Sequence, residues 1–118
     1  MSINIPYGKQ YISDEDTKAV VDALHSDFLT QGPRISEFEN NFASYIGSKY
    51  AIAVSNGTAA LHLPLLASGI GEGDRIITTP ITFAASANAA LYCGAKVHFV
   101  DIDRDTYVIS FDGIKELL

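Results

Sequence analysis

Ser55-Asn56-Gly57-Thr58-Ala59-Ala60 joins an apolar run that ends at Val54 to a run that begins as a helix. A turn of this composition leaves several backbone N–H groups without partners at the start of the helix. The helix dipole adds partial positive charge at the same place, and the two effects together suit a phosphate dianion. The sequence therefore predicts an anion-binding turn at residues 55–59.

Apolar, strand-like runs alternate with helical stretches around this turn. We expect strands at residues 50–54, 75–79 and 96–100, helices at 13–26, 36–46, 58–68 and 84–93, and a last helix that begins near 112. Strands separated by helices of about ten residues or more are typical of βαβ crossovers. The predicted fold class is α/β, with a mostly parallel sheet and flanking helices.

Several local signals place the helix ends. Ser13 is an N-cap candidate with an acidic first turn after it. Ser36 and Glu39 have capping-box spacing before the second helix, and Gly47 provides its C-terminal stop. Pro64 is expected to kink the third helix or to destabilise it by roughly 3 kcal/mol. The large residues on one face of the second helix are expected to lie in the core: Phe38, Phe42, Tyr45 and Ile46.

The composition limits the classes of function. The chain has 118 residues, 47% of them hydrophobic, which is enough for a folded core. Its formal net charge is -6 and its basic residues are scattered singly, which argues against a nucleic-acid partner. Cys93, the single cysteine, is expected to be buried and inert, and we find no signal peptide and no apolar run of about 20 residues. We therefore expect a soluble, cytoplasmic protein that does not enter membranes.

Other residues raise hypotheses about ligands. Phe28 and Leu29 stand in a loop at residues 27–33, where they either line a pocket or plug into the core below; the sequence leaves both possibilities open. Asp101 and Asp103 are interpreted as turn and capping groups, because two carboxylates at one strand end lack the further oxygen ligands of a hard cation. The three histidines have no metal-ligand or triad spacing, so no metal is expected.

Three segments are expected at the carboxyl ends of strands, where ligands collect in parallel α/β sheets. They are residues 55–59, 80–83 and 101–103. We expect all three to share one edge of the sheet.

An ordered set of motifs covers nearly the whole chain: residues 29–33, 37–39, 55–62, 71–74, 79–83 with 87–88, and 99–103. In order and spacing these motifs resemble the DegT/DnrJ/EryC1/StrS sugar aminotransferases, which use pyridoxal 5'-phosphate (PLP). The resemblance implies the aspartate-aminotransferase-like fold of type I. Within the family, the chain is most similar to members that act in pseudaminic acid biosynthesis, through residues 5–8, 27–33 and 78–83.

The resemblance implies roles for particular residues. Gly57, Thr58 and Ala59 would contact the cofactor phosphate or the group attached to it. Phe83 would stack on the pyridine ring, with an ordinary core position as the alternative. The positions that line the sugar-nucleotide site in the family match Tyr7, Asp27, Phe28, Leu29 and Thr30. For Tyr7, a role as a packing anchor is the alternative.

The resemblance also implies a reaction. The parent enzyme would move an amino group from glutamate to a keto sugar nucleotide, such as a UDP-linked 4-keto-6-deoxy sugar, and would act as a homodimer. The lysine that carries the cofactor and the carboxylate at its pyridine nitrogen match no position up to 118, so we assign no catalytic residue. We expect residues 1–118 to form an N-terminal arm and an incomplete cofactor-binding domain, without the rest of the large domain or the small domain. Such a chain is expected to be inactive by itself.

Two other classes stay open. One is a nucleotide-binding α/β module of the Rossmann or flavodoxin type. Its Gly-x-Gly-x-x-Gly fingerprint is missing after the first strand, and residues 69–73, which imitate it, are expected to end a helix. The other is a non-catalytic regulatory relative that keeps the anion-binding turn.

Overall fold

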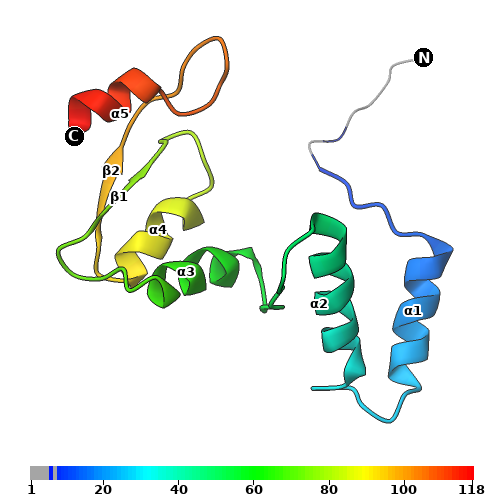
Figure 1. Ribbon diagram of the computed structural model, residues 1–118. Helices are drawn as coiled ribbons and strands as arrows, with labels where there is room; N and C mark the ends of the chain where they lie inside the picture. The colour runs from blue at the N-terminus through cyan, green and yellow to red at the C-terminus, as the bar shows by residue number, and fades with distance from the viewer. Residues whose placement is uncertain (1–5, 7) are drawn as a thin grey trace, which may run out of the picture. The chain divides into compact units, whose positions relative to one another are not determined.

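The computed structural model describes Pro6 and residues 8–118, so Tyr7 lies outside the described residues. The described chain carries five helices and two strands (Figure 1). It divides into two compact units, Met1–Ala53 and Val54–Leu118. The first unit holds two of the helices, and the second holds three helices and both strands.

Helix α1 of the first unit spans Asp14–Leu24 and begins where its sequence predicts. The Ser13 hydroxyl accepts the Asp16 amide at 3.2 Å, and the Asp16 carboxylate accepts the Ser13 amide at 2.9 Å. This reciprocal capping box satisfies two donors at the helix end. Lys18 and Asp22 form an exposed ion pair of 2.7 Å, which stabilises the helix by roughly 0.3–0.5 kcal/mol.

Helix α2 spans Pro33–Ile46 and begins before the predicted capping box. Gly32 is its N-cap, and Pro33 occupies the first turn, where a fixed φ and a missing N–H are both acceptable. The predicted capping box of Ser36 and Glu39 is therefore wrong, because both residues lie inside the helix. Gly47 ends the helix in the left-handed conformation with φ 71°, as predicted.

The apolar face of α2 is exposed in the described chain. Its large side chains, Phe38, Phe42, Tyr45 and Ile46, are between 46% and 90% exposed. The prediction that they lie in the core is wrong for these residues, because the described part of the first unit contains only two helices and offers this face no further layer. Phe38 and Phe42 instead stack on each other, with ring centroids 5.8 Å apart.

Residues 50–54 do not form the predicted strand. A strand needs a neighbour for its backbone groups, and the only sheet among the described residues pairs two other segments. The Ala53 amide donates instead to the Glu39 carboxylate at 2.8 Å. Residues 50–54 therefore have no partner strand among the described residues.

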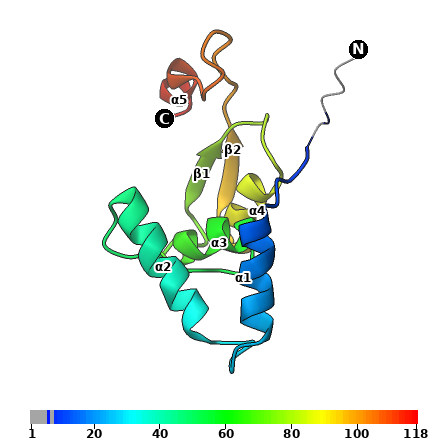
Figure 2. The ribbon, with the colours of Figure 1, turned by 90° about the vertical axis from the view of Figure 1, so that its right-hand side faces the viewer.

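The second unit runs from helix α3 (Gly57–Ala67) through strand β1 (Arg75–Thr78), helix α4 (Ala85–Tyr92) and strand β2 (Lys96–Phe99) to helix α5 (Phe111–Leu117). Strands β1 and β2 pair in parallel, with Ile76 opposite Val97 and Ile77 opposite His98. Helix α4 is the crossover between them and packs against both strands, as Figure 2 shows. The predicted α/β class with a parallel sheet and flanking helices is confirmed.

Helix α3 corresponds to the helix predicted at residues 58–68. Pro64 lies inside it, and the helix nevertheless continues to Ala67, with one missing hydrogen bond at the Ala60 carbonyl. Gly69 follows with φ 78° in the left-handed region. The glycine-rich run at residues 69–73 thus ends a helix, as predicted, and does not open a dinucleotide-binding one.

The core of the second unit is built from small side chains. Its buried residues are Ala85, Ala89, Ala90, Ala95 and Val100. Alanines let α4 approach the strands closely, and α4 also packs against α3. Gly113 does the same for α5, since a Cβ there would lie 2.7 Å from Val100 Cγ1. Cys93, predicted to be buried, is only half-buried.

Candidate functional site

The first turn of α3 carries the predicted anion-binding amides. The Asn56 side chain is the N-cap and accepts the Ala59 amide at 2.9 Å. The amides of Gly57 and Thr58 have no acceptor among the described residues. Apart from the chain neighbours of Gly57 and the backbone of its own helix, no atom lies within 4 Å of the place that a Cβ on Gly57 would occupy, so no other segment of the described chain covers this position. Two backbone donors at the positive end of an eleven-residue helix therefore remain available to an anion.

The cap changes which donors the turn can offer. Because the Ala59 amide already donates to Asn56, Ala59 has no free N–H for a phosphate. The Asn56 amide group donates to the Ser55 hydroxyl at 3.2 Å, which further orders the turn. Contact of Gly57, Thr58 and Ala59 with a cofactor phosphate stays a prediction. Of these three residues, Gly57 and Thr58 have an amide that is free to donate to the phosphate.

Phe83 lies in the loop that follows the carboxyl end of β1. Phe83 is 77% exposed, so within the described chain it is not a core residue. Its backbone is nevertheless ordered, because its carbonyl accepts the Ser86 amide at 3.0 Å in the first turn of α4. Next to it, the hydroxyls of Thr82 and Ser86 lie 3.2 Å apart. An aromatic face on a fixed backbone is suited to stacking on a flat ring.

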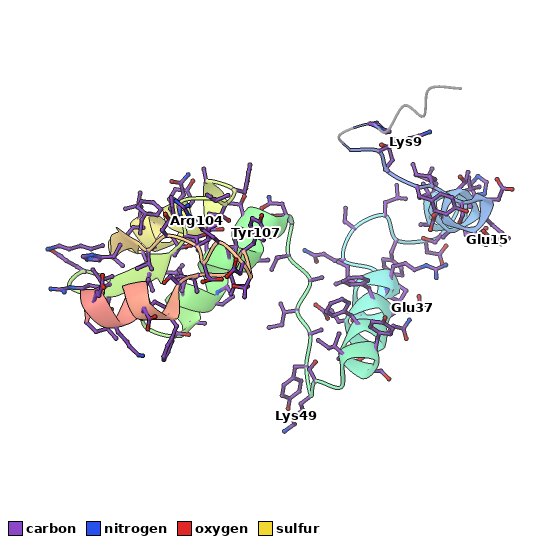
Figure 3. All side chains as sticks on the ribbon, turned by 90° about the horizontal axis from the view of Figure 1, so that it is seen from above. Lys9, Glu15, Glu37, Lys49, Arg104 and Tyr107 are labelled. Atoms are coloured by element: carbon purple, nitrogen blue, oxygen red, sulfur yellow. The ribbon has the colours of Figure 1, made fainter. Side chains whose placement is uncertain are left out.

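Asp101 and Asp103 follow β2 and have the turn roles predicted for them. Asp101 accepts the Ile102 amide at 2.8 Å, and Asp103 Oδ1 accepts the Thr106 amide and hydroxyl, each at 2.9 Å, and the Asp105 amide at 3.1 Å. The hydrogen bonds from Thr106, its amide first, hold the pKa of the Asp103 carboxyl below its usual value. Figure 3 labels Arg104 and Tyr107 on this loop.

The sheet brings together two of the three segments predicted to share an edge. Residues 80–83 follow β1 and residues 101–103 follow β2, and the two strands are parallel, so both segments lie at the same edge. The turn at residues 55–59 follows a segment that is not a strand. Its place at that edge stays a prediction.

The predicted substrate loop belongs to the first unit. Phe28 and Leu29 are 62% and 70% exposed, which favours the pocket-lining interpretation over plugging into the core. They line a hollow of about 210 Å³ together with Val20, Ala23, Leu24, Gly32 and Arg34. The Ser26 hydroxyl lies 2.7 Å from the Ala23 carbonyl at the end of α1 and 3.1 Å from the Phe28 carbonyl, so its single proton is shared between the helix end and the loop. Gln31 has a left-handed backbone, with φ 53°, which is a strained conformation for a residue other than glycine.

Three features of the structure were not predicted from the sequence. The first is the cap of α3 by Asn56, although asparagine directly before a helix is a common N-cap signal. The bond from Ala53 to Glu39 joins residues 14 apart, and no local signal points to it. His62 on α3 lies edge-on to Tyr92, and its buried Nε2 has no partner among the described residues.

Among the described residues, no group of three or more His, Cys, Asp or Glu side chains is placed to hold a metal ion. No helix formed by residue 6 and residues 8–118 combines the length and the hydropathy that crossing a bilayer requires.

The chain is similar to known aminotransferases in sequence and in structure. Residues 10–118 match the profile of the DegT/DnrJ/EryC1/StrS aminotransferase family. The sequence is 48% identical over 101 residues to the UDP-4-amino-4,6-dideoxy-N-acetyl-beta-L-altrosamine transaminase of Campylobacter jejuni, a match that covers 86% of this chain and 27% of that protein.

Two solved structures show the same similarity. Helicobacter pylori PseC, an aminotransferase involved in the biosynthesis of pseudoaminic acid, has a TM-score of 0.88 and 34% identity, with 96% of this chain and 31% of that chain covered. Streptococcus pneumoniae Spr1654 in its PLP form has a TM-score of 0.91 and 31% identity, with 98% and 30% covered. The chain thus spans less than a third of the length of each of these relatives.

Proposed function

This chain belongs to the DegT/DnrJ/EryC1/StrS aminotransferase family, and we propose that it supplies the phosphate-binding turn and part of the substrate loop of a PLP-dependent sugar aminotransferase. The observation that carries the proposal is the pair of open amides at the N-terminus of α3, in one of the ordered motifs on which the family resemblance rests. The similarity to a structure solved in a PLP form supports the choice of cofactor.

The turn fits a phosphate dianion. The amides of Gly57 and Thr58 are free to donate, and the Asn56 cap restrains the turn before any ligand arrives. Donors that are already partly ordered bind an anion with a smaller entropic cost. Ala59, whose amide is engaged by the cap, is proposed only as a van der Waals neighbour of the cofactor. PLP, when bound, supplies the electron sink that amino transfer requires.

Phe83 is proposed to cover one face of the cofactor ring. Its exposed side chain and its fixed backbone support this role, since a ring stacked on it would bury the apolar surface that the described chain leaves open. Such a contact would also set the plane of the ring. No catalytic residue is assigned to this chain.

The substrate is proposed to be a keto sugar nucleotide, with glutamate as the amino donor. The relative from C. jejuni is named for a UDP-linked amino sugar, which supports a UDP-linked 4-keto-6-deoxy sugar of the pseudaminic acid pathway or a similar one. Asp27, Phe28, Leu29 and Thr30 would line its site, and the hollow beside Phe28 and Leu29 supports that role. Tyr7, which is not described, stays in the proposal through the resemblance alone.

The assembly and the compartment are also proposals. We place residues 1–118 in the N-terminal arm and the cofactor-binding domain of a homodimeric, cytoplasmic enzyme. The exposed aromatic face of α2 supports association, because an apolar face of this kind is usually covered by other protein. We propose that residues 1–118 alone do not catalyse the reaction, because the family's cofactor-bearing lysine matches none of their positions.

A proline substitution tests the phosphate-binding turn. Gly57 is the first residue of α3, where proline is favoured, and Asn56 before it is extended, as the residue before a proline prefers. Gly57→Pro therefore removes one N–H donor and keeps the helix. In the complete polypeptide that carries this chain, we expect PLP to bind at least tenfold more weakly, because a hydrogen bond to a charged group contributes about 1.5–3 kcal/mol.

Gly57→Ala is the matched control, since it keeps the N–H and finds open space around its Cβ. We expect it to bind PLP nearly as tightly as the unsubstituted protein in the same absorbance titration. Unchanged PLP affinity in Gly57→Pro, with the fold intact by circular dichroism, would show that the phosphate does not lie at this helix end.

A further inference from the structure

One side chain ties the segment before the anion-binding turn to helix α2. Glu39 lies inside α2, and its Oε1 accepts the Ala53 amide at 2.8 Å in a partly buried position. Among the described residues, the other side-chain hydrogen bonds join residues at most four positions apart, whereas this bond joins residues 14 positions apart. The charged acceptor makes it stronger than a bond between neutral groups.

The Ala53 amide depends on this partner. Residues 50–54 belong to neither strand of the described sheet, so no ladder bond is available to the amide there. A partly buried N–H that loses its acceptor is costly, and the backbone around it would move to find water. Glu39 therefore selects one conformation of the peptide at Ala53.

The restraint passes along the covalent chain to the turn. The turn begins at Ser55, only two residues after Ala53. Each peptide unit between them is planar, so few torsion angles separate the held amide from the Asn56 cap. An amide held at Ala53 reduces the number of conformations that residues 54–56 can adopt. Fewer conformations mean a smaller entropic cost when the amides of Gly57 and Thr58 bind an anion.

We propose that Glu39 is a positioning residue for the phosphate-binding turn: it touches neither cofactor nor substrate, and it raises PLP affinity by holding the Ala53 peptide. The inference rests on the proposed function of the turn.

The test compares three variants of the complete polypeptide that carries this chain. Glu39→Ala removes the acceptor, and Glu39→Gln keeps a side-chain carbonyl at the same distance from the backbone. Glu37→Ala is the matched control: Glu37 is a neighbouring carboxylate on α2, exposed and paired with Arg34 at 3.0 Å (Figure 3). Hydrogen exchange of the peptide covering residues 50–54 is measured without cofactor, and PLP affinity is measured by titration.

We expect Glu39→Ala to accelerate exchange at residues 50–54 about tenfold, the effect of losing one hydrogen bond to a charged group, and to weaken PLP binding about five- to tenfold. Glu39→Gln should recover most of both effects, and Glu37→Ala should change neither. If Glu39→Ala does not fold, Glu39→Asp replaces it, because a side chain shorter by one methylene withdraws the carboxylate from the amide.

Two results would overturn the inference. Exchange at residues 50–54 that stays unchanged in Glu39→Ala would show that the bond does not restrain the segment. Faster exchange with unchanged PLP affinity would show that Glu39 stabilises the segment only and does not position the turn. Failure of the unsubstituted protein to bind PLP would reject the proposed function itself, and it is recognised before any variant is compared.

Discussion

Asn56 caps helix α3, and it does so without a charge beside the amides that are proposed to bind phosphate. An aspartate substitution would separate these two properties. The Asn56 Oδ1 accepts the Ala59 amide at 2.9 Å and caps α3. Asn56→Asp keeps an acceptor at that place and adds a negative charge at the helix N-terminus, where the dipole favours it by about 0.3–1 kcal/mol. We therefore expect the cofactor-free protein to be as stable as the unsubstituted one or slightly more stable. The same charge should repel a phosphate bound to the neighbouring amides.

The repulsion can be worked from hydrogen-bond lengths. The carboxylate oxygen would lie near the present 2.9 Å from the Ala59 nitrogen. A phosphate oxygen on the Thr58 amide would lie about 2.8 Å from the Thr58 nitrogen, and we take roughly 5–6 Å as the distance between the centres of the two anions. One negative charge against a dianion at this distance costs about 1.5 kcal/mol even with the dielectric constant of water. PLP should therefore bind about tenfold more weakly.

The assay is a PLP titration at low ionic strength, with thermal unfolding of the cofactor-free protein beside it. Asn56→Ala is the control: it loses the cap, at a cost of about 1 kcal/mol, and adds no charge. We expect Asn56→Ala to lower the melting temperature and to weaken PLP less than Asn56→Asp does. Added salt should restore part of the loss in Asn56→Asp, because it screens the repulsion. An Asn56→Asp protein that binds PLP as tightly as the unsubstituted protein at low salt would refute the reasoning.

Three further predictions concern other parts of the chain. A Cβ on Gly32 would lie 2.7 Å from Phe28 Cβ, so Gly32→Ala should displace Phe28. We expect this variant to raise KM for the sugar nucleotide severalfold and to leave PLP affinity unchanged. An unaltered KM in steady-state kinetics of the complete enzyme would contradict this. His62→Phe removes a buried nitrogen that has no partner in the described chain, so the melting temperature should hold or rise by the equivalent of up to about 1 kcal/mol, whereas a clear fall would reveal a partner. Hydrogen bonds from Thr106 lower the pKa of Asp103, so their contribution to stability is present above the pKa of an unfolded aspartate and is lost as pH falls below about 4. An NMR titration of the Thr106 amide should show this step. Asp103→Asn should remove it.

Local signals predicted much of the fold. The cap at Ser13, the left-handed Gly47 and the crossover around α4 all follow from patterns that span a few residues or one helix. The capping box at Glu39 failed because a stronger start signal, glycine followed by proline, stands just before it. A local pattern decides a helix end only when no better pattern competes nearby.

Non-local partners account for the other errors. Residues 50–54 have the composition of a strand, and a strand exists only where another segment supplies its hydrogen bonds. The aromatic residues of α2 have the periodicity of a buried face, and periodicity shows that side chains share a face without supplying the layer that would cover them. In both cases the missing information is the identity of a neighbour in space.

The sequence by itself determined the family, the parallel α/β class and the turn at residues 55–59, because ordered motifs and helix-start signals are properties of neighbouring residues. The cap from Asn56 to Ala59, which leaves the amides of Gly57 and Thr58 free, is also a local bond over three residues. Only the tertiary structure decided which acceptor holds Ala53, because Glu39 reaches across 14 residues to it. Such a bond depends on where the backbone places an acceptor in space, and spacing along the chain does not encode that position.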